Sequence, residues 1–256
     1  MSGIEKQLRE IDKLNTLQQR DQWMNRCHPL VKLCLTIVYI LFVVSCHKYQ
    51  LSMVVIFAVY PLMMFNFADL SLKDAIYRMR LILPIVMAVG IFNPFMDREP
   101  VMQLGSVTLT GGCISMITLM LKGFYAVLAA YLLIATTTIE DICFALRRLH
   151  VPKILVTVIL LIDRYLYILG QEADRIMTAY KLRAPSQKGI HYKAWGSLVG
   201  QWLIRSMERA QVVYESMTLR GYRGEFAYGE TRKLTAKDML LLAAWLVAFA
   251  VIRRGF

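Results

Sequence analysis

Two arginines in the second half of the chain occupy matching positions, each inside a Leu-Arg-small triplet. The triplets are Leu182-Arg183-Ala184 and Leu219-Arg220-Gly221. A guanidinium can donate two parallel hydrogen bonds to one carboxylate, which suits it to an acidic groove on another protein. An arginine at a helix C-terminus also interacts favourably with the helix dipole, which is a purely local role. Because the triplet repeats and a glycine- or proline-containing stop follows each copy, we favour docking over the local role.

The first triplet closes a long segment with helical periodicity. In residues 151–184 the apolar side chains fall on one helical face, and charged residues such as Asp163, Arg164 and Arg175 fall off it. A helix with this charge pattern does not simply sit in lipid. Asp163 and Arg164 could form an intramembrane relay, but the polar face continues to Arg175. That continuation favours a solvated position at the membrane boundary.

The second triplet closes a similar segment. After a breaker at 185–189, helical periodicity restarts and runs through 195–217, with Trp195 and Trp202 on the apolar face. We expect this face to pack on the preceding helix. Two amphipathic helices that each end in an arginine predict a platform outside the lipid that binds another protein.

No catalytic motif accompanies these arginines. The chain lacks the phosphate-binding GxxxxGK[ST] pattern, the HExxH zinc pattern and the GxSxG nucleophile pattern. The sequence therefore predicts a non-catalytic protein with no catalytic residues. If it takes part in ATP-driven work, another subunit must supply the ATPase.

Histidines and cysteines do not form a chelating pattern either. The five cysteines show no CxxC spacing. The pairs Cys27-His28 and Cys46-His47 are adjacent in sequence, and adjacent residues on a helix point about 100° apart. His150 and His191 stand alone. The sequence predicts no metal site, no disulfide framework and no cofactor.

Composition places the chain in a membrane. Hydrophobic residues make up 57% of it, and the net charge is +12. The cations do not form an aromatic-interleaved patch, so we expect no nucleic-acid partner. The predicted fold is all-α: a polytopic membrane protein with about five transmembrane helices plus cytoplasmic amphipathic helices. The expected spans are Leu30–Cys46, Leu51–Phe67, Leu81–Met96, Cys113–Thr138 and Asp238–Ile252.

These spans divide the chain into four predicted regions. They are an amphipathic N-terminal segment (1–29), transmembrane helices 1–4 (30–138), cytoplasmic helices (139–236) and a final transmembrane helix (237–256). With five spans, 25 of the 30 lysines and arginines share a side with the N-terminus, namely 6 in 1–32, 3 in 69–80 and 16 in 139–237. The positive-inside bias therefore predicts a cytoplasmic N-terminus and an outside C-terminus.

Three local features carry further expectations. Pro61 should bend the second span, because proline removes one helical hydrogen bond. Lys32, in the first turn of the first span, can snorkel to the membrane surface. Residues 97–112, which include a Val-Thr-Leu-Thr stretch, are expected to form a loop.

Several motifs along the chain match one known family. In chain order they are His28-Pro-Leu-Val-Lys-Leu, Thr136-Thr-Thr-Ile-Glu-Asp-Ile, Ala145-Leu-Arg-Arg-Leu-His-Val-Pro-Lys, Asp163-Arg-Tyr-Leu-Tyr, Glu172-Ala-Asp-Arg-Ile, Arg205-Ser-Met-Glu-Arg-Ala, Val213-Tyr-Glu-Ser-Met and Leu219-Arg-Gly-Tyr-Arg-Gly. From about His28 to Phe226 the chain resembles the transmembrane T components of energy-coupling factor transporters, in the cobalt/nickel (CbiQ-like) branch. The last motif is the most specific. The first triplet departs from the usual Ala-Arg-Gly or Ala-Arg-Ser form, although Arg183 itself is kept.

The resemblance implies partners and a role. Arg183 and Arg220 would end coupling helices that sit in grooves of two ATP-binding-cassette (ABC) ATPases. The further implied partners are the lipid bilayer, a CbiM- or NikM-like substrate-binding membrane subunit, and a small accessory membrane subunit. ATPase closure would move the coupling helices and rock the substrate-binding subunit, which holds the metal. The expected protein is thus the coupling subunit of an ATP-driven cobalt or nickel importer in the bacterial inner membrane.

Other functions compete with this interpretation. A T component of a vitamin transporter would share these motifs. An integral membrane enzyme, a different class, would need a polar cluster at membrane depth, and the sequence offers only Lys122 and Asp163 there. A secondary transporter usually shows repeated transmembrane halves, which the sequence lacks.

Overall fold

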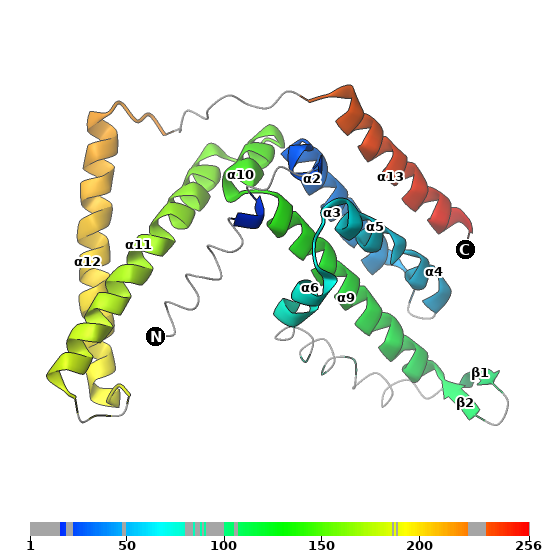
Figure 1. The fold of residues 1–256 in the computed structure, drawn as a ribbon, viewed down its shortest axis with the longest axis horizontal. Coiled ribbons are helices and arrows are strands. Elements are labelled where there is room, and N and C mark those ends of the chain that lie inside the picture. Colours follow the sequence, from blue (N-terminus) through cyan, green and yellow to red (C-terminus); the bar gives the residue numbers. More distant parts are fainter. Residues whose placement is uncertain are drawn as a thin grey trace. The chain divides into compact units, whose positions relative to one another are not determined.

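The computed structural model describes residues 16–18, 23–47, 50–79, 84, 88, 90, 100–104, 107–185, 187, 189–224 and 234–255, which are predominantly helical (Figure 1). The chain divides into two compact units. The bundle unit comprises Leu17–Thr138 and Arg232–Phe256, and the crossing unit comprises Met1–Thr16 and Ile139–Thr231. The described elements of the bundle unit are α2 (Trp23–Arg26), α3 (Pro29–Ser45), α4 (Leu51–Ile56), α5 (Val59–Phe67), α6 (Leu72–Met79), β1 (Pro100–Leu104), β2 (Val107–Thr110), α9 (Gly111–Thr136) and α13 (Ala236–Gly255). Those of the crossing unit are α10 (Ile139–Arg148), α11 (Lys153–Arg183) and α12 (Tyr192–Leu219).

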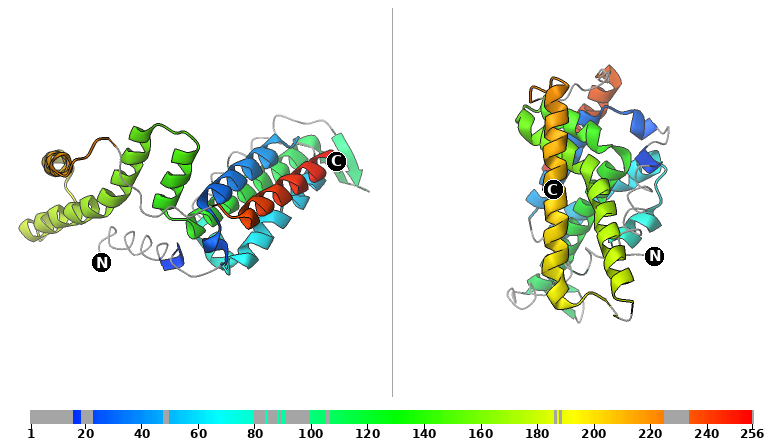
Figure 2. Two further views of the ribbon diagram at one scale, coloured as in Figure 1. Left: turned by 90° about the horizontal axis from the view of Figure 1, so that it is seen from above. Right: turned by 90° about the vertical axis from the view of Figure 1, so that its left-hand side faces the viewer.

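Helices α3 and α13 of the bundle unit run side by side in the same direction (Figure 2, left). At the start of α3, the backbone N–H of His28 donates to Asp238 Oδ1 in the first turn of α13 (3.4 Å). The other oxygen of Asp238 accepts the N–H of Thr235 (3.2 Å), which is half of a capping box. Toward the far end of α3, the Arg253 guanidinium lies 5.7 Å from the centroid of the Phe42 ring. Both helices therefore begin at one end of the bundle, which we call the His28 end.

Two lysines join α3 to α9, which runs antiparallel to it. Lys32 Nζ donates to the carbonyl oxygen of Thr136, the last residue of α9 (2.7 Å). Lys122 Nζ of α9 donates to the carbonyls of Cys46 and Val44 (3.3 Å for Val44) at the end of α3. Helix C-termini carry unpaired carbonyls and the negative end of the dipole. Each of the two helices therefore places a lysine ammonium at the C-terminal carbonyls of the other. The two contacts lie roughly four helical turns apart along each helix.

The Lys122 contact makes a stability prediction. Lys122→Met keeps most of the side-chain volume but removes the donor to the end of α3, so we expect a loss of about 1–2 kcal/mol. Thermal unfolding of the purified chain in detergent would measure it. Lys73→Met, on the exposed face of α6, is the matched control and should change little. An unfolding temperature for Lys122→Met equal to that of the control would contradict the capping role.

The predicted bend at Pro61 is confirmed, since α4 ends at Ile56 and α5 begins at Val59. Proline has no N–H, so the Phe57 carbonyl four residues earlier has no helical donor. The Tyr39 hydroxyl of α3 donates to that carbonyl (3.0 Å). The carbonyl left without a helical donor at the break thus accepts a hydrogen bond from a side chain of α3. This bond fixes α3 against α4 and α5.

Aromatic side chains fill the core of the bundle unit between α3, α4, α5 and α13. The largest fully buried aromatic residues are Tyr39, Tyr60, Phe57, Phe65 and Phe249. Apolar residues on the outer faces of α3, α4 and α5 are exposed, as expected for helices that face lipid. They include Leu41, Val55, Val59, Leu62 and Phe67.

Residues 97–112 differ from the expected loop. Within them β1 and β2 pair antiparallel, with Leu104 opposite Val107. The β-branched and apolar residues of the Val-Thr-Leu-Thr stretch favour a strand, and a strand partner precedes them by only a few residues. The predicted amphipathic segment 1–29 and the third expected span, Leu81–Met96, lie largely outside the described residues.

Among the described residues, two helical stretches are long and apolar enough to cross a membrane, Ile114–Thr136 of α9 and Lys153–Arg183 of α11. Pro29–Ser45 and Leu51–Phe67 are shorter apolar helical stretches. The chain is therefore a helical protein with membrane-spanning character. By length and hydropathy α11 could span the membrane too, although the sequence analysis predicts a position outside the lipid for it.

Candidate docking site

Within the crossing unit, α10 packs on the start of α11. The described buried residues are Cys143 and Ala145 on α10 and Val156 and Thr157 on α11. Burial, with a smaller effect of the Asp163 and Glu140 charges, raises the pKa of the Cys143 thiol, so it packs as a small protonated side chain. The N-terminal half of the apolar stripe of α11 is largely exposed in the isolated chain, and the C-terminal half is partly buried. Its exposed members include Leu155, Val158, Ile162 and Leu166.

A tight turn separates α10 from α11. The N–H of Val151 donates to the Leu146 carbonyl (3.2 Å) and the N–H of His150 to the Arg147 carbonyl (3.1 Å). This pair of bonds is a Schellman motif, and it requires His150 to adopt a left-handed backbone with φ 63°. Pro152 then occupies the N-cap of α11. The turn therefore stops one helix and starts the next within four residues of chain.

The second triplet ends α12 in the same motif. Arg220 is the C-cap residue, and the N–H of Tyr222 donates to the Met217 carbonyl (3.0 Å) while that of Gly221 donates to Thr218 (3.0 Å). Gly221 has φ 80°, a conformation that glycine adopts without strain. Apart from its neighbours in the chain, no described residue has a heavy atom within 4 Å of where a Cβ on Gly221 would be, so the need for glycine is conformational rather than steric.

The first triplet ends α11 differently. Ala184 is the C-cap residue, with φ −132° and ψ 66°, and its N–H donates to the Tyr180 carbonyl. This backbone lies outside the left-handed region, so alanine follows Arg183 without strain. The departure of this triplet from the family form is therefore compatible with the local backbone.

Tyr180 ties the α11–α12 connection together. Its hydroxyl donates to Gln187 Oε1 (2.7 Å) and accepts the N–H of His191 (3.1 Å). His191 in turn caps α12, because its Nδ1 accepts the N–H of Lys193 (3.3 Å). The end of α11 is thus held beside the beginning of α12, as Figure 1 also shows.

Both triplets present their side chains outward. Leu182 is 77% exposed and Leu219 is 89% exposed, and Arg183 and Arg220 are exposed as well. Within the part of the chain that is described, neither guanidinium has a hydrogen-bond or ion-pair partner. Arg183 is the last residue of α11, whose end is held beside the beginning of α12, and Arg220 is the C-cap of α12. The 28 residues of α12 therefore separate the two arginines by about 40 Å.

At two described positions a histidine side chain caps the N-terminus of a helix. His28 Nδ1 accepts the N–H of Leu30 (3.2 Å) at the start of α3, as His191 does for α12. Across the described ranges, no three His, Cys, Asp or Glu side chains come together as metal ligands.

The sequence predicts that the apolar face of α12 packs on the preceding helix, but in the isolated chain no described residue of α12 is buried and Trp195 is 50% exposed. Trp202 does contact that helix, through a hydrogen bond from its Nε1 to the Leu169 carbonyl (3.2 Å). It remains 36% exposed, so truncating it should cost less than truncating a fully buried tryptophan. Near this contact Arg205 binds Glu172. Sequence reasoning did not find this pair, because periodicity reports which residues share a helix face and not which residues meet across two helices. Its only signal was that both residues stand in the motifs that carry the family resemblance.

A family model described as "Cobalt transport protein", CbiQ, matches residues 20–230. The nickel permease LarQ of Lactiplantibacillus plantarum is 28% identical over 114 residues, which are 44% of this chain and 42% of LarQ. The cobalt transport protein CbiQ of Rhodobacter capsulatus is 28% identical over 124 residues, 48% of this chain and 50% of that protein.

An uncharacterized protein of Methanocaldococcus jannaschii is 24% identical over 208 residues, 77% of this chain and 71% of its own length. The alignments with the two named transport proteins thus cover half or less of their lengths. The family match is broader and takes in both arginine triplets, all of α10–α12 and the described helices from α2 to α9.

Proposed function

The chain belongs to the CbiQ family of cobalt transport proteins, and on that premise we propose that it is the membrane scaffold of an ATP-driven cobalt or nickel importer. In this role it binds two ABC ATPases through Arg183 and Arg220 and transmits their motion to a substrate-binding membrane subunit. The chain itself is non-catalytic. The observation that carries the proposal is the pair of exposed arginine triplets at the ends of α11 and α12, whose guanidiniums have no partner within the described part of the chain.

The separation of the arginines supports two docking places rather than one. About 40 Å lies between the ends of a helix of this length, which is more than one side-chain groove spans. Each arginine stands beside an exposed leucine, so each place offers a charged fork and an apolar contact together. Two copies of one ATPase could each accept one triplet.

The direction of the bundle helices shows at which end the chain leaves and re-enters the bundle unit. α9 ends and α13 begins at the His28 end, where Lys32 binds Thr136 and Asp238 binds the His28 backbone. The chain therefore leaves the bundle unit and returns to it at the same end. We propose that this end is cytoplasmic, that five spans place the C-terminus outside, and that the protein lies in a bacterial inner membrane with its N-terminus inside.

The observed contacts of Lys122 argue against a membrane enzyme. Its ammonium binds two backbone carbonyls at the end of α3, which is a structural use of the charge. A vitamin-specific T component would share the docking site, so the substrate must be tested directly.

Co-purification and uptake test the proposal together. The tagged chain is expressed in its native cells and extracted in mild detergent. It should retain a subunit that binds ATP and carries a phosphate-binding loop. Cells with the complete complex should take up radiolabelled cobalt or nickel in an ATP-dependent manner and should not take up a labelled vitamin. Absence of an ATPase from the purified complex would refute the coupling role, and uptake of a vitamin instead would refute the metal substrate.

Topology gives a separate prediction. A reporter inserted at residues 186–187 should lie in the cytoplasm, and one fused after Phe256 should lie outside. If α11 crossed the membrane, the reporter at 186–187 would lie on the outside instead. That result would move the first triplet away from any cytoplasmic ATPase and would overturn the docking assignment.

A further inference from the structure

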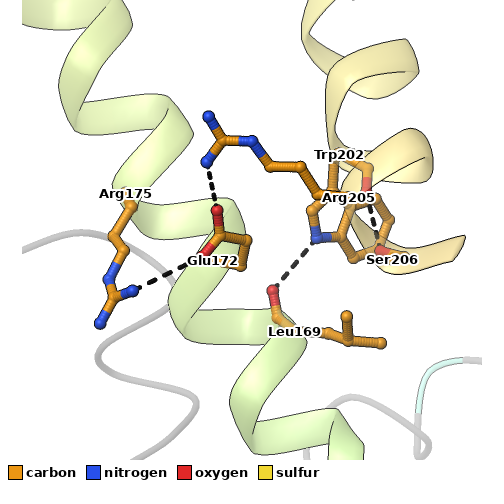
Figure 3. A network of polar contacts seen from close by, with 6 residues as sticks. All are labelled: Leu169, Glu172, Arg175, Trp202, Arg205 and Ser206. Carbon is orange, nitrogen blue, oxygen red and sulfur yellow. Dashed lines mark hydrogen bonds and ion pairs between the residues drawn. The ribbon is translucent and has the colours of Figure 1, made fainter. Parts of the chain in front are cut away.

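Helices α11 and α12 contact each other through a small network of polar contacts (Figure 3). Arg205 of α12 binds Glu172 of α11, and one turn away the Trp202 indole N–H donates to the Leu169 carbonyl at 3.2 Å. Leu169 and Glu172 lie near the midpoint of α11, and Trp202 and Arg205 near the midpoint of α12. The two helices therefore cross at these four residues.

Little apolar burial holds this crossing in the isolated chain. Among its described residues α12 has no buried side chain, and Trp202 is 36% exposed. Interlocked apolar side chains normally set the angle at which two helices cross. Here the directional contacts of Trp202 and Arg205 must supply much of that constraint.

Glu172 is held from both sides. Arg205 binds its Oε1 from the other helix, and Arg175 lies 3.6 Å from its Oε2 on the same helix. The Glu172 side chain is 24% exposed, whereas that of Arg175 is 76% exposed. The carboxylate is thus partly shielded, and of its two cations only Arg205 belongs to α12.

We propose that Glu172 and Arg205, with the Trp202 hydrogen bond, form a pivot that fixes the angle between α11 and α12 and so the spacing of the two docking arginines. This inference rests on the proposed function. The three residues are positioning residues, since they lie far along the helices from Arg183 and Arg220. Each arginine stands about 16–22 Å from the pivot, so a rotation of about 10° moves it by about 3–4 Å. A displacement of that size exceeds the tolerance of a hydrogen bond.

The angle can be measured in the full chain, reconstituted in lipid nanodiscs, with spin labels on cysteines introduced at Lys181 and Thr218. Both positions are exposed and lie beside, but not in, the triplets. The native cysteines are first replaced. We expect one narrow distance distribution in the parent chain. Glu172→Gln and Arg205→Gln should each broaden it or shift its centre by about 3–4 Å, as the lever-arm estimate requires.

Two variants isolate the cross-helix pair. Arg175→Gln removes the other cation at Glu172 and should leave the distribution unchanged. The exchange Glu172→Arg with Arg205→Glu should restore the narrow distribution. It is made together with Arg175→Gln, so that the exchanged cation does not face Arg175. An unchanged distribution in Glu172→Gln or Arg205→Gln, or no restoration in the exchange, would overturn the pivot.

Transport measurements separate the failure of the pivot from the failure of the proposed function. In the complete transporter Glu172→Gln should still retain the ATPases, because each intact triplet can still dock by itself when the spacing between the two changes, and should take up less metal. The charge exchange should recover that uptake. If the parent chain retains no ATPase, the proposed function fails regardless of the distances. If it does and Glu172→Gln transports like the parent, the pivot fails alone.

Discussion

Alanine at both Arg183 and Arg220 should detach the ATPases from the chain while leaving its fold unchanged. Each guanidinium is exposed and has no described partner within the chain, so its removal breaks no internal contact. In a complex, each would leave a partner carboxylate buried and unpaired, at a cost of about 2–5 kcal/mol. Each single change should therefore uncouple ATP hydrolysis from uptake, and the double change should abolish retention. Lysine should rescue only in part, because it lacks the planar fork.

The measurement is retention of the ATPase on the tagged chain, alongside uptake of radiolabelled cobalt or nickel. The matched control is the double change Lys181→Ala and Arg223→Ala, which removes the same charge from exposed positions close to the two triplets. The control should retain the ATPases. Normal uptake by the Arg183→Ala, Arg220→Ala double variant at parental protein levels would refute the docking assignment.

Phe249→Ala should produce the largest loss of stability, with little direct effect on docking. Phe249 is 0% exposed, and its ring centroid lies 5.6 Å from that of Tyr39, 5.5 Å from Tyr60 and 6.0 Å from Phe57. Truncating a fully buried phenylalanine costs about 3–5 kcal/mol. Membrane helices associate through packing, so the cavity left between α13 and its neighbours accounts for much of that cost.

Thermal unfolding in detergent would measure this loss. Leu240→Ala, on the same helix but 72% exposed, is the control and should lower stability by less than about 1 kcal/mol. Equal losses for the two variants would show that α13 is not anchored through its aromatic face. Because the arginine variants should affect assembly alone and the Phe249 variant stability first, the two experiments test the crossing unit and the bundle unit separately.

Local patterns in the sequence determined much of this protein by themselves. Apolar spacing located α3, the α4–α5 pair, α9, α11, α12 and α13 to within a few residues, and Pro61 marked the break between α4 and α5. The two triplets marked the ends of α11 and α12, and Gly221 marked the kind of end. These features follow from bonds between residues three to five apart, which the order of residues specifies directly.

Contacts between distant segments were decided only by the tertiary structure. Lys32 could equally have snorkelled to the membrane surface, yet it binds the Thr136 carbonyl, 104 residues away. Lys122 was one of only two ionisable residues that the sequence offered to a membrane enzyme, yet its ammonium binds backbone carbonyls at the end of α3. Glu172 and Arg205 are unremarkable charges on two polar faces until the crossing of α11 and α12 brings them together. Helical periodicity shows which side chains share a face, and only the path of the whole chain determines what that face meets.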